Sequence, residues 1–330
     1  MNEKNIKDGR RLSKDGQGLP AFIIVGAMKA GTTSLHYILS QHKDIFIPNR
    51  EIMFFDIDDI EQNFDFFVQT SKRWQIFDYR TNFQKYLKWY KSFFREAKKG
   101  QLIGEDSTTY MASSKAPARI PELLPDVKLI FMLRDTAART YSNYWHLVKT
   151  GHAIYNFEKT LQYMPGTLLQ RSLYKQQIER YKNYFPDSQM KFIIFEDFIK
   201  NTQQNIDEIC KFIGLRTSID ISKINTHKNA TLVPRCIRLQ IFYNHISRTR
   251  RLVTQQFGSH LPNLPNERAN WFWRKTDKLV YKFNFTGNKS YPKMKSETRK
   301  FLERLFFKEN RGLSKLIGRD IREYWDYIKD

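Results

Sequence analysis

The chain has 330 residues, of which 41% are hydrophobic and 27% charged, and this composition excludes a chain that is disordered over most of its length. Its two cysteines exclude a disulfide framework, and no apolar run reaches the roughly 18 residues that a membrane-spanning helix needs. The net charge of +22, concentrated from Arg235 onward, favours anionic partners: nucleotides, acidic glycans, nucleic acid or a membrane surface. A basic face that meets only solvent is equally compatible with the charge alone.

Strands and helices are expected to alternate along the chain. Residues 1–18 are polar, without a signal-peptide core, and are expected to be a disordered tail of a cytoplasmic protein. The apolar run Ala21–Ala27 predicts a buried parallel strand, and Thr33–Gln41 carries the apolar spacing of a helix. Further helices are expected at 82–98, 136–149, 172–184 and 205–213, and further strands at 101–105, 127–133 and 190–196.

This alternation predicts an α/β protein with a P-loop-like three-layer fold, in which helices cover both faces of a central, mostly parallel sheet. No convincing strand is expected after residue 230, so the last part is expected to be a helical C-terminal extension. Because no linker, internal repeat or low-complexity segment interrupts residues 19–330, that range is expected to be a single domain.

The turn after the first strand is expected to bind an anion. Gly26 and Gly31 lie in a turn that leads into a helix, whose first backbone N–H groups and dipole favour negative charge. A Walker A loop has lysine directly after its second glycine, but here Thr32 stands there and Lys29 precedes Gly31. The spacing therefore argues against an NTPase. A glycine-containing turn alone is also compatible with an ordinary strand–turn–helix unit.

A second anion-binding element is expected where the strand 127–133 ends. Ligands of open α/β sheets lie at the carboxyl ends of the strands, and Arg134 stands at that point. Its paired N–H donors and the hydroxyl of Ser142 suit a phosphate. An exposed helix start that binds nothing is the alternative.

Glu51 is the candidate general base. It lies between the cation Arg50 and the aromatic pair Phe54–Phe55, so burial would raise the pKa of its carboxyl and Arg50 would lower it. A surface glutamate before an aromatic core pair is the alternative. Four histidines near the motifs rank below Glu51 as bases: His36, His42, His146 and His152.

Three strings together resemble the PAPS-dependent sulfotransferases, where PAPS is 3′-phosphoadenosine-5′-phosphosulfate. They are K-x-G-T-T-S-L from Lys29, R-D-x-x-x-R-x-x-S-x-Y from Arg134, and R-E-I-M-F-F around Glu51; the last is similar to the heparan sulfate glucosaminyl sulfotransferases and their bacterial relatives. The usual proline before the loop lysine is Met28 here. The resemblance implies that the cofactor is held by Lys29, Ala30, Gly31, Thr32, Thr33, Ser34, Arg134, Ser142 and Lys289, and that Lys29 and Glu51 are catalytic.

The resemblance implies transfer of a sulfuryl group from PAPS to a hydroxyl or amine of a carbohydrate or glycolipid, without a metal. Asp106 replaces a lysine of the family's G-E-K-[ST]-P-x-Y segment, so we expect an acceptor other than heparan sulfate. An anionic membrane that holds a lipid acceptor is a further expected partner. The alternatives are a P-loop kinase or NTPase, and a nucleic-acid-binding protein suggested by the basic run Ser247–Arg251.

Overall fold

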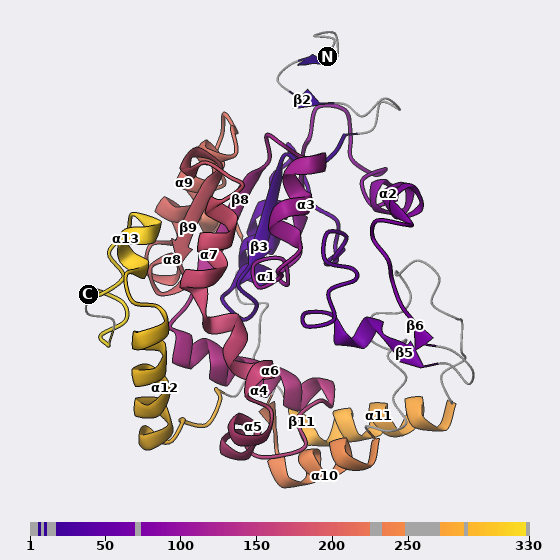
Figure 1. Ribbon diagram of the computed structural model, residues 1–330, viewed down its shortest axis with the longest axis vertical. Coiled ribbons are helices and arrows are strands. Elements are labelled where there is room, and N and C mark those ends of the chain that lie inside the picture. The colour runs from indigo at the N-terminus through magenta and orange to yellow at the C-terminus, as the bar shows by residue number, and fades with distance from the viewer. Residues whose placement is uncertain are drawn as a thin grey trace. The chain divides into compact units, whose positions relative to one another are not determined.

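The computed structural model describes residues 6–7, 10–11, 18–69, 74–224, 233–247, 271–286 and 290–327. The chain divides into two compact units (Figure 1). The first contains Met1–Asp135, Leu173–Thr226 and Phe307–Asp330, and the second contains Thr136–Ser172 and His227–Phe306. In the parts of the chain just given, no helix is both long and apolar enough to cross a membrane.

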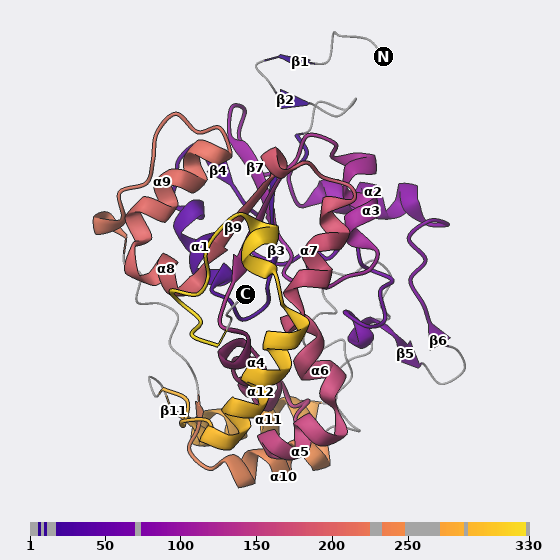
Figure 2. The same ribbon diagram turned by 60° about the vertical axis from the view of Figure 1, so that its left-hand side comes forward.

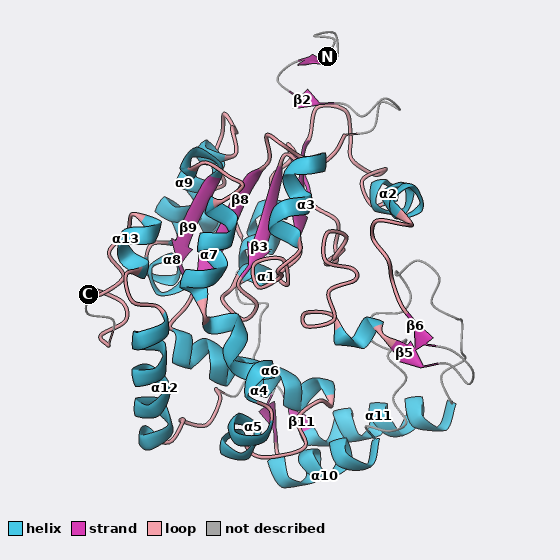
Figure 3. Ribbon diagram, in the orientation of Figure 1, coloured by secondary structure: helices cyan, strands magenta, loops and turns pink. Residues whose placement is uncertain are grey.

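The first unit is built on a five-stranded parallel sheet, drawn in magenta in Figure 3. The strand order is β4-β7-β3-β8-β9, with β4 at one edge and β9 at the other. The strands are β3 (Phe22–Gly26), β4 (Ile45–Phe46), β7 (Leu102–Asp106), β8 (Lys128–Leu133) and β9 (Met190–Ile194). The central strand β3 is buried at every residue, as expected of a strand that is covered on both faces. The predicted parallel sheet is therefore confirmed.

Helices cover both faces of this sheet. Figure 2 shows α1 (Thr32–Ser40), α8 (Phe195–Lys200) and α9 (Thr202–Phe212) on one side, and α3 (Ala116–Leu123) and α7 (Tyr174–Lys182) on the other. This arrangement confirms the expected three layers. The apolar face of α1 is buried through Leu35, Ile38 and Leu39.

Several elements of this unit differ from the sequence-based expectation. Helix α2 (Phe83–Ser92) ends six residues before the expected Lys98, and residues 93–96 continue as turns. Helix α3 was not expected because Pro121 lies inside it, although Pro117 suits its first turn. Helix α8 begins at Phe195, where the strand was expected to continue to Glu196.

Shorter elements complete the first unit. They are the antiparallel pairs β1 (Ile6–Lys7) with β2 (Arg10–Arg11) and β5 (Val68–Gln69) with β6 (Trp74–Gln75), the 3-10 helices η2 (Phe64–Phe66), η4 (Asp187–Gln189) and η5 (Ile221–Lys223), and α13 (Leu313–Ile317). The pair β1–β2 lies in the segment 1–18, which is expected to be a disordered tail. The tail and the single domain over residues 19–330 both stay predictions.

The second unit is mostly helical, in agreement with the helical C-terminal extension that the sequence predicts. Its elements are α4 (Thr136–Thr150), α5 (Phe157–Tyr163), α6 (Pro165–Leu169), η3 (Gln170–Ser172), β10 (Val233–Pro234), α10 (Ile237–Ser247), α11 (Trp271–Asn284), β11 (Phe285–Thr286) and α12 (Ser296–Glu309), of which the last runs past Phe306. The antiparallel pair β10–β11 corrects the expectation of no strand after residue 230. Each strand has two residues, which is too short for an alternating pattern to appear.

Candidate active site

The loop between β3 and α1 has the backbone shape of an anion-binding turn. Gly26, Lys29 and Gly31 adopt positive φ angles of 136°, 69° and 92°. Gly31, which has no side chain, is the N-cap of α1. The first turn of α1 therefore presents backbone N–H groups at the carboxyl edge of the sheet, as the sequence predicted.

The predicted loop residues differ in exposure. Ala30 and Thr32 are buried, Lys29, Gly31 and Ser34 are half-buried, and Thr33 is exposed. Thr33 and Ser34 lie in the first turn of α1, so their hydroxyls remain suited to an anion at the helix start. The loop lies next to β8, since the Ala27 N–H donates to the carbonyl of Met132 over 2.8 Å.

Arg134 joins the two predicted cofactor elements of the first unit. Its Nη1 donates to the carbonyl oxygen of Lys29 over 3.1 Å. Its guanidinium carbon lies 4.8 Å from the centre of the Phe195 ring, which is a cation–π contact. The same ring packs on Gly31, where an added Cβ would lie 2.6 Å from Cδ2 of Phe195. The loop between β3 and α1, the Phe195 ring and Arg134 therefore form one contiguous structure.

The backbone of Arg134 is fixed as well. The Tyr174 hydroxyl accepts from the Arg134 N–H over 3.3 Å and donates to the Arg134 carbonyl over 3.0 Å. Glu196 accepts from the N–H of Asp135 over 3.0 Å. Nothing in the local sequence assigns Phe195 to the loop between β3 and α1, because the contact joins residues that are far apart in the chain.

Two predicted cofactor residues are not brought to Arg134 by these contacts. Ser142 is buried within α4 of the second unit, so its joint grip on a phosphate with Arg134 stays a prediction. Lys289 lies outside the described residues. Arg139, in the same motif as Ser142, is completely buried and bonds to Ser172 and the Leu168 carbonyl, which is a structural role.

Glu51 is held at the end of β7, the strand beside β3. Its Oε2 accepts from the Thr108 N–H over 3.0 Å and from the Thr108 hydroxyl over 2.8 Å. Thr108 follows Asp106, the last residue of β7. Because parallel strands end at the same edge, Glu51 and the loop between β3 and α1 belong to the same edge of the sheet.

The residues after Glu51 are held by hydroxyl groups from the segment after β7. Ser107 Oγ accepts from the N–H groups of Ile52 and Met53, both over 3.1 Å. The Tyr110 hydroxyl accepts from the N–H groups of Phe54 over 2.8 Å and Phe55 over 3.3 Å. We call Glu51–Phe55 the base segment.

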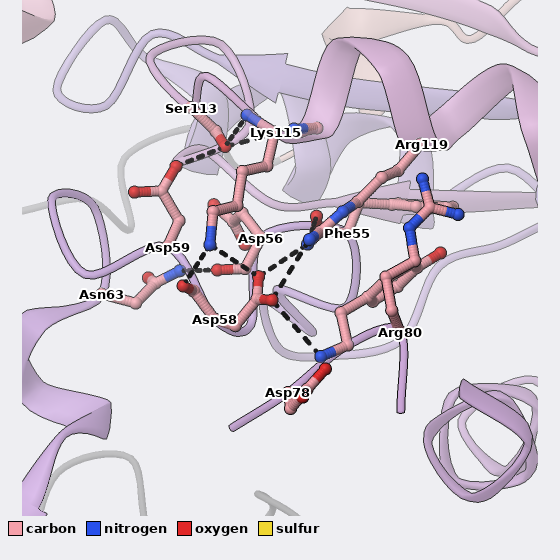
Figure 4. Close-up of polar contacts among 12 residues, drawn as sticks. Phe55, Asp56, Asp58, Asp59, Asn63, Asp78, Arg80, Ser113, Lys115 and Arg119 are labelled. Carbon is pink, nitrogen blue, oxygen red and sulfur yellow. Dashed lines mark hydrogen bonds and ion pairs between the residues drawn. The ribbon is translucent and has the colours of Figure 1, made fainter. Parts of the chain in front are cut away.

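The far end of this stretch is fixed by ion pairs (Figure 4). Arg119 donates to both oxygens of Asp58 and to the carbonyl of Phe55, and Lys115 bonds to Asp58 and its carbonyl. Although burial raises the pKa of Asp58, the Arg119 and Lys115 charges hold it below its ordinary value. Asp59 accepts from the Ser113 hydroxyl over 2.6 Å. The contacts of Arg119 with Phe55 and Asp58 thus anchor the end of the base segment, whereas the Asp59–Ser113 bond lies outside that segment.

Asp106, which stands where the resembled family has lysine, is paired with a histidine. His36 Nδ1 on α1 lies 3.2 Å from Asp106 Oδ2. Burial raises the pKa of Asp106, and the His36 hydrogen bond opposes that rise. His42 bonds to Thr217 instead, and His146 and His152 belong to the second unit. Within the described ranges, no three His, Cys, Asp or Glu side chains are arranged to hold a metal ion.

Comparisons with known proteins agree with this geometry. The family model described as "Sulfotransferase domain" matches residues 19–267. Heparan sulfate glucosamine 3-O-sulfotransferase 5 of Mus musculus is 27% identical over 240 residues, which are 69% of this chain and 62% of that protein. Bifunctional heparan sulfate N-deacetylase/N-sulfotransferase 2 of Homo sapiens is 26% identical over 339 residues, which are 96% of this chain and 32% of that protein. The chain thus spans less than two thirds of the length of these relatives.

A solved structure shows the same fold. The sulfotransferase from Alicyclobacillus acidocaldarius superimposes with a TM-score of 0.58 at 22% sequence identity. The match covers 92% of this chain and 97% of that chain. The central parallel sheet with its flanking helices is therefore a sulfotransferase fold.

Proposed function

This chain belongs to the sulfotransferase domain family, and we propose that it transfers a sulfuryl group from PAPS to a hydroxyl or amine of a saccharide or glycolipid. The observation that carries the proposal is the contact of Arg134 with both Lys29 and Phe195. PAPS carries anionic groups at its 5′ and 3′ positions, so a protein that binds it needs cationic donors at two joined places. The loop and Arg134 supply those donors within one unit.

The proposed reaction follows from the chemistry of the side chains. The acceptor oxygen attacks sulfur while the bond from sulfur to the bridging oxygen breaks, and its electron pair leaves with 3′-phosphoadenosine 5′-phosphate. Glu51 takes the proton of the acceptor. Lys29 stabilises the charge that develops on the bridging oxygen, and the hydroxyls of Thr32, Thr33 and Ser34 hold the 5′-phosphate.

A saccharide acceptor is supported by two features of the first unit. Trp74 on β6 is 62% exposed, and an exposed indole offers a flat surface on which a sugar ring can stack. Asp106 at the end of β7 stands where the resembled motif has a lysine, and its buried carboxyl pairs with His36, so the positive charge that would attract an acidic sugar is missing at this position. We therefore propose a neutral or amine-bearing sugar in place of heparan sulfate.

A glycolipid within an anionic membrane is the form of acceptor that the second unit supports. Leu239, Phe242 and Ile246 recur at helical spacing on α10 and are 54%, 62% and 40% exposed, and Arg238 beside them is exposed too. A cytoplasmic location is part of the same proposal. Binding to anionic but not to neutral vesicles, lost in Phe242→Glu, tests it.

The function is tested by supplying labelled PAPS with a panel of acceptors: neutral and amine-bearing oligosaccharides, glycolipids, sulfated glycans, phenols and steroids. We expect label on a neutral or amine-bearing saccharide or glycolipid. Turnover of phenols alone would reject the proposed saccharide or glycolipid acceptor but would still support sulfuryl transfer from PAPS. Phosphoryl transfer from ATP with no use of PAPS would support the kinase alternative, and salt-dependent gel shifts without turnover would support the nucleic-acid alternative.

A further inference from the structure

We infer that Glu105 is a positioning residue for the reaction, because its ionised carboxylate fixes the direction of the hydroxyl groups that hold the base segment. The inference rests on the proposed role of Glu51 as the general base. Glu105 lies in β7 and is completely buried, and its carboxylate accepts from the hydroxyls of Ser107 and Tyr110. It acts through Ser107 and Tyr110.

Three hydroxyl groups donate to the Glu105 carboxylate. Ser107 Oγ and the Tyr110 hydroxyl donate to Oε1 over 2.8 Å and 2.6 Å, and the Tyr90 hydroxyl of α2 donates to Oε2. Each hydroxyl has a single hydrogen, so a hydroxyl that donates to Glu105 turns its lone pairs elsewhere. The carboxylate thereby fixes the directions in which the three hydroxyl groups donate and accept hydrogen bonds.

The lone pairs of two of these hydroxyls face the base segment. Ser107 accepts from the N–H groups of residues 52 and 53, and Tyr110 accepts from those of residues 54 and 55. Backbone N–H groups can only donate, so both hydroxyls must send their hydrogens to Glu105. A protonated Glu105 would either donate from Oε1 and compete for the lone pairs that hold the segment, or donate from Oε2 to Tyr90, whose own hydrogen would then lose Glu105 as its acceptor.

The phenols that surround the Glu105 carboxylate add no charge to the cluster. Burial raises the pKa values of the surrounding phenols well above their ordinary range, so Tyr90 on α2, Tyr110 and Tyr181 on α7 are neutral near pH 7. The adjacent Asp106 is the charged neighbour of Glu105, and Asp56 acts on Tyr110 and Tyr181. Burial raises the pKa of Glu105 to about 7, against the hydrogen bonds from Tyr110, Tyr90 and Ser107. The segment should therefore be held better as the pH rises through neutrality.

The test compares Glu105→Gln with wild type in kcat from pH 5.5 to 8.5 and in affinity for 3′-phosphoadenosine 5′-phosphate by calorimetry. In wild type, kcat should rise through a midpoint near pH 7. A carboxamide has one acceptor oxygen and two donor hydrogens, so it cannot accept all three hydroxyls. Glu105→Gln should lower kcat about 10- to 100-fold by displacing Glu51, lose the midpoint near 7, and leave nucleotide affinity within about twofold.

Asp59→Asn is the matched control. Asp59 is a buried carboxyl that also accepts from a serine hydroxyl and two backbone N–H groups, but those belong to Ser113, Glu61 and Gln62. It should lose stability and keep the wild-type midpoint. Wild-type kcat and an unchanged profile in Glu105→Gln, or loss of the midpoint in both variants alike, would overturn the inference.

Two milder variants keep the inference testable if Glu105→Gln does not fold. Ser107→Ala and Tyr110→Phe each remove one hydroxyl, and each should lower kcat while nucleotide affinity is kept. Their combination should cost less than the product of the single effects, since both act through the same segment; independent effects count against the inference. Failure of the proposed function is a different result: no sulfuryl transfer by wild type, or full activity of Glu51→Gln.

Discussion

Gly31→Ala tests whether the loop between β3 and α1 and Arg134 are joined through Phe195. Gly31 has a φ of 92°, and a non-glycine residue in the left-handed region costs about 1–2 kcal/mol. The new Cβ would also lie 2.6 Å from Cδ2 and 2.8 Å from Cε2 of Phe195. Relieving that overlap should cost about 1–3 kcal/mol more, because the ring carries the Arg134 guanidinium on its face.

Gly214→Ala is the matched control for this prediction. Gly214 has a similar φ of 84°, but an added Cβ there meets no atom within 4 Å. Its free energy of unfolding should therefore fall only by the cost of the left-handed backbone conformation, about 1–2 kcal/mol. Urea unfolding of both variants gives the difference in the free energy of unfolding, and that difference measures the overlap with Phe195.

The overlap between the new methyl group and Phe195 also predicts a rescue. Gly31→Ala should weaken binding of 3′-phosphoadenosine 5′-phosphate in a calorimetric titration, whereas Gly214→Ala should not. Phe195→Ala makes room for the new methyl group, so the double variant should be more stable than the sum of the single losses predicts. Equal losses in Gly31→Ala and Gly214→Ala, or strict additivity with Phe195→Ala, would refute the proposed link.

Three further predictions concern charge. Because the folded-state pKa of Glu105 is raised from 4.5 to about 7, the folded state keeps a proton that the unfolded chain releases, so the free energy of unfolding should fall as the pH rises from about 4.5 to 7. The fall should approach about 3 kcal/mol, and urea unfolding at pH 5 and pH 7.5 should show it in wild type and not in Glu105→Gln. Glu51→Gln should lower kcat by ~10²–10⁴ with nucleotide affinity kept, and Lys29→Ala should be nearly inactive; a dead histidine variant beside an active Glu51→Gln would contradict the base assignment. Arg134→Ala should erase the preference for 3′-phosphoadenosine 5′-phosphate over AMP, a loss of ~2–5 kcal/mol by calorimetry, and unchanged discrimination would reject the assignment.

The parts of the fold that repeat a local pattern were predictable from sequence. The apolar strands β3, β8 and β9 lie close to their expected ranges, because burial on both faces leaves a continuous apolar run, and so do the helices α1 and α4. The position of Arg134 followed from the rule that ligands lie at the carboxyl ends of parallel strands. The short strands, and α3 with its internal Pro121, carry no such pattern and were missed.

The contacts that shape the candidate site were not predictable, because they join residues that are distant in sequence. His36 meets Asp106 from 70 positions away, and Ser107 holds Ile52 from 55 positions away. The sequence identified Glu51 by its neighbours and its resemblance, but Glu105 gave no signal beyond a place in a motif. Its role depends on which way three hydroxyl groups point, and that direction exists only in the folded chain.

The bond from Arg134 to the carbonyl of Lys29 has a consequence for how a nucleotide would be recognised. On the proposed function, one guanidinium serves both ends of the ligand, so the two ends are thermodynamically coupled, and such coupling is reciprocal. Pyrophosphate bound in the loop would change the affinity for adenosine 3′-phosphate by a certain factor, and bound adenosine 3′-phosphate would change the affinity for pyrophosphate by the same factor. A nucleotide would then be bound selectively when it occupies both ends of the site at the same time. A fragment that matches one end would bind to a site that is only partly organised.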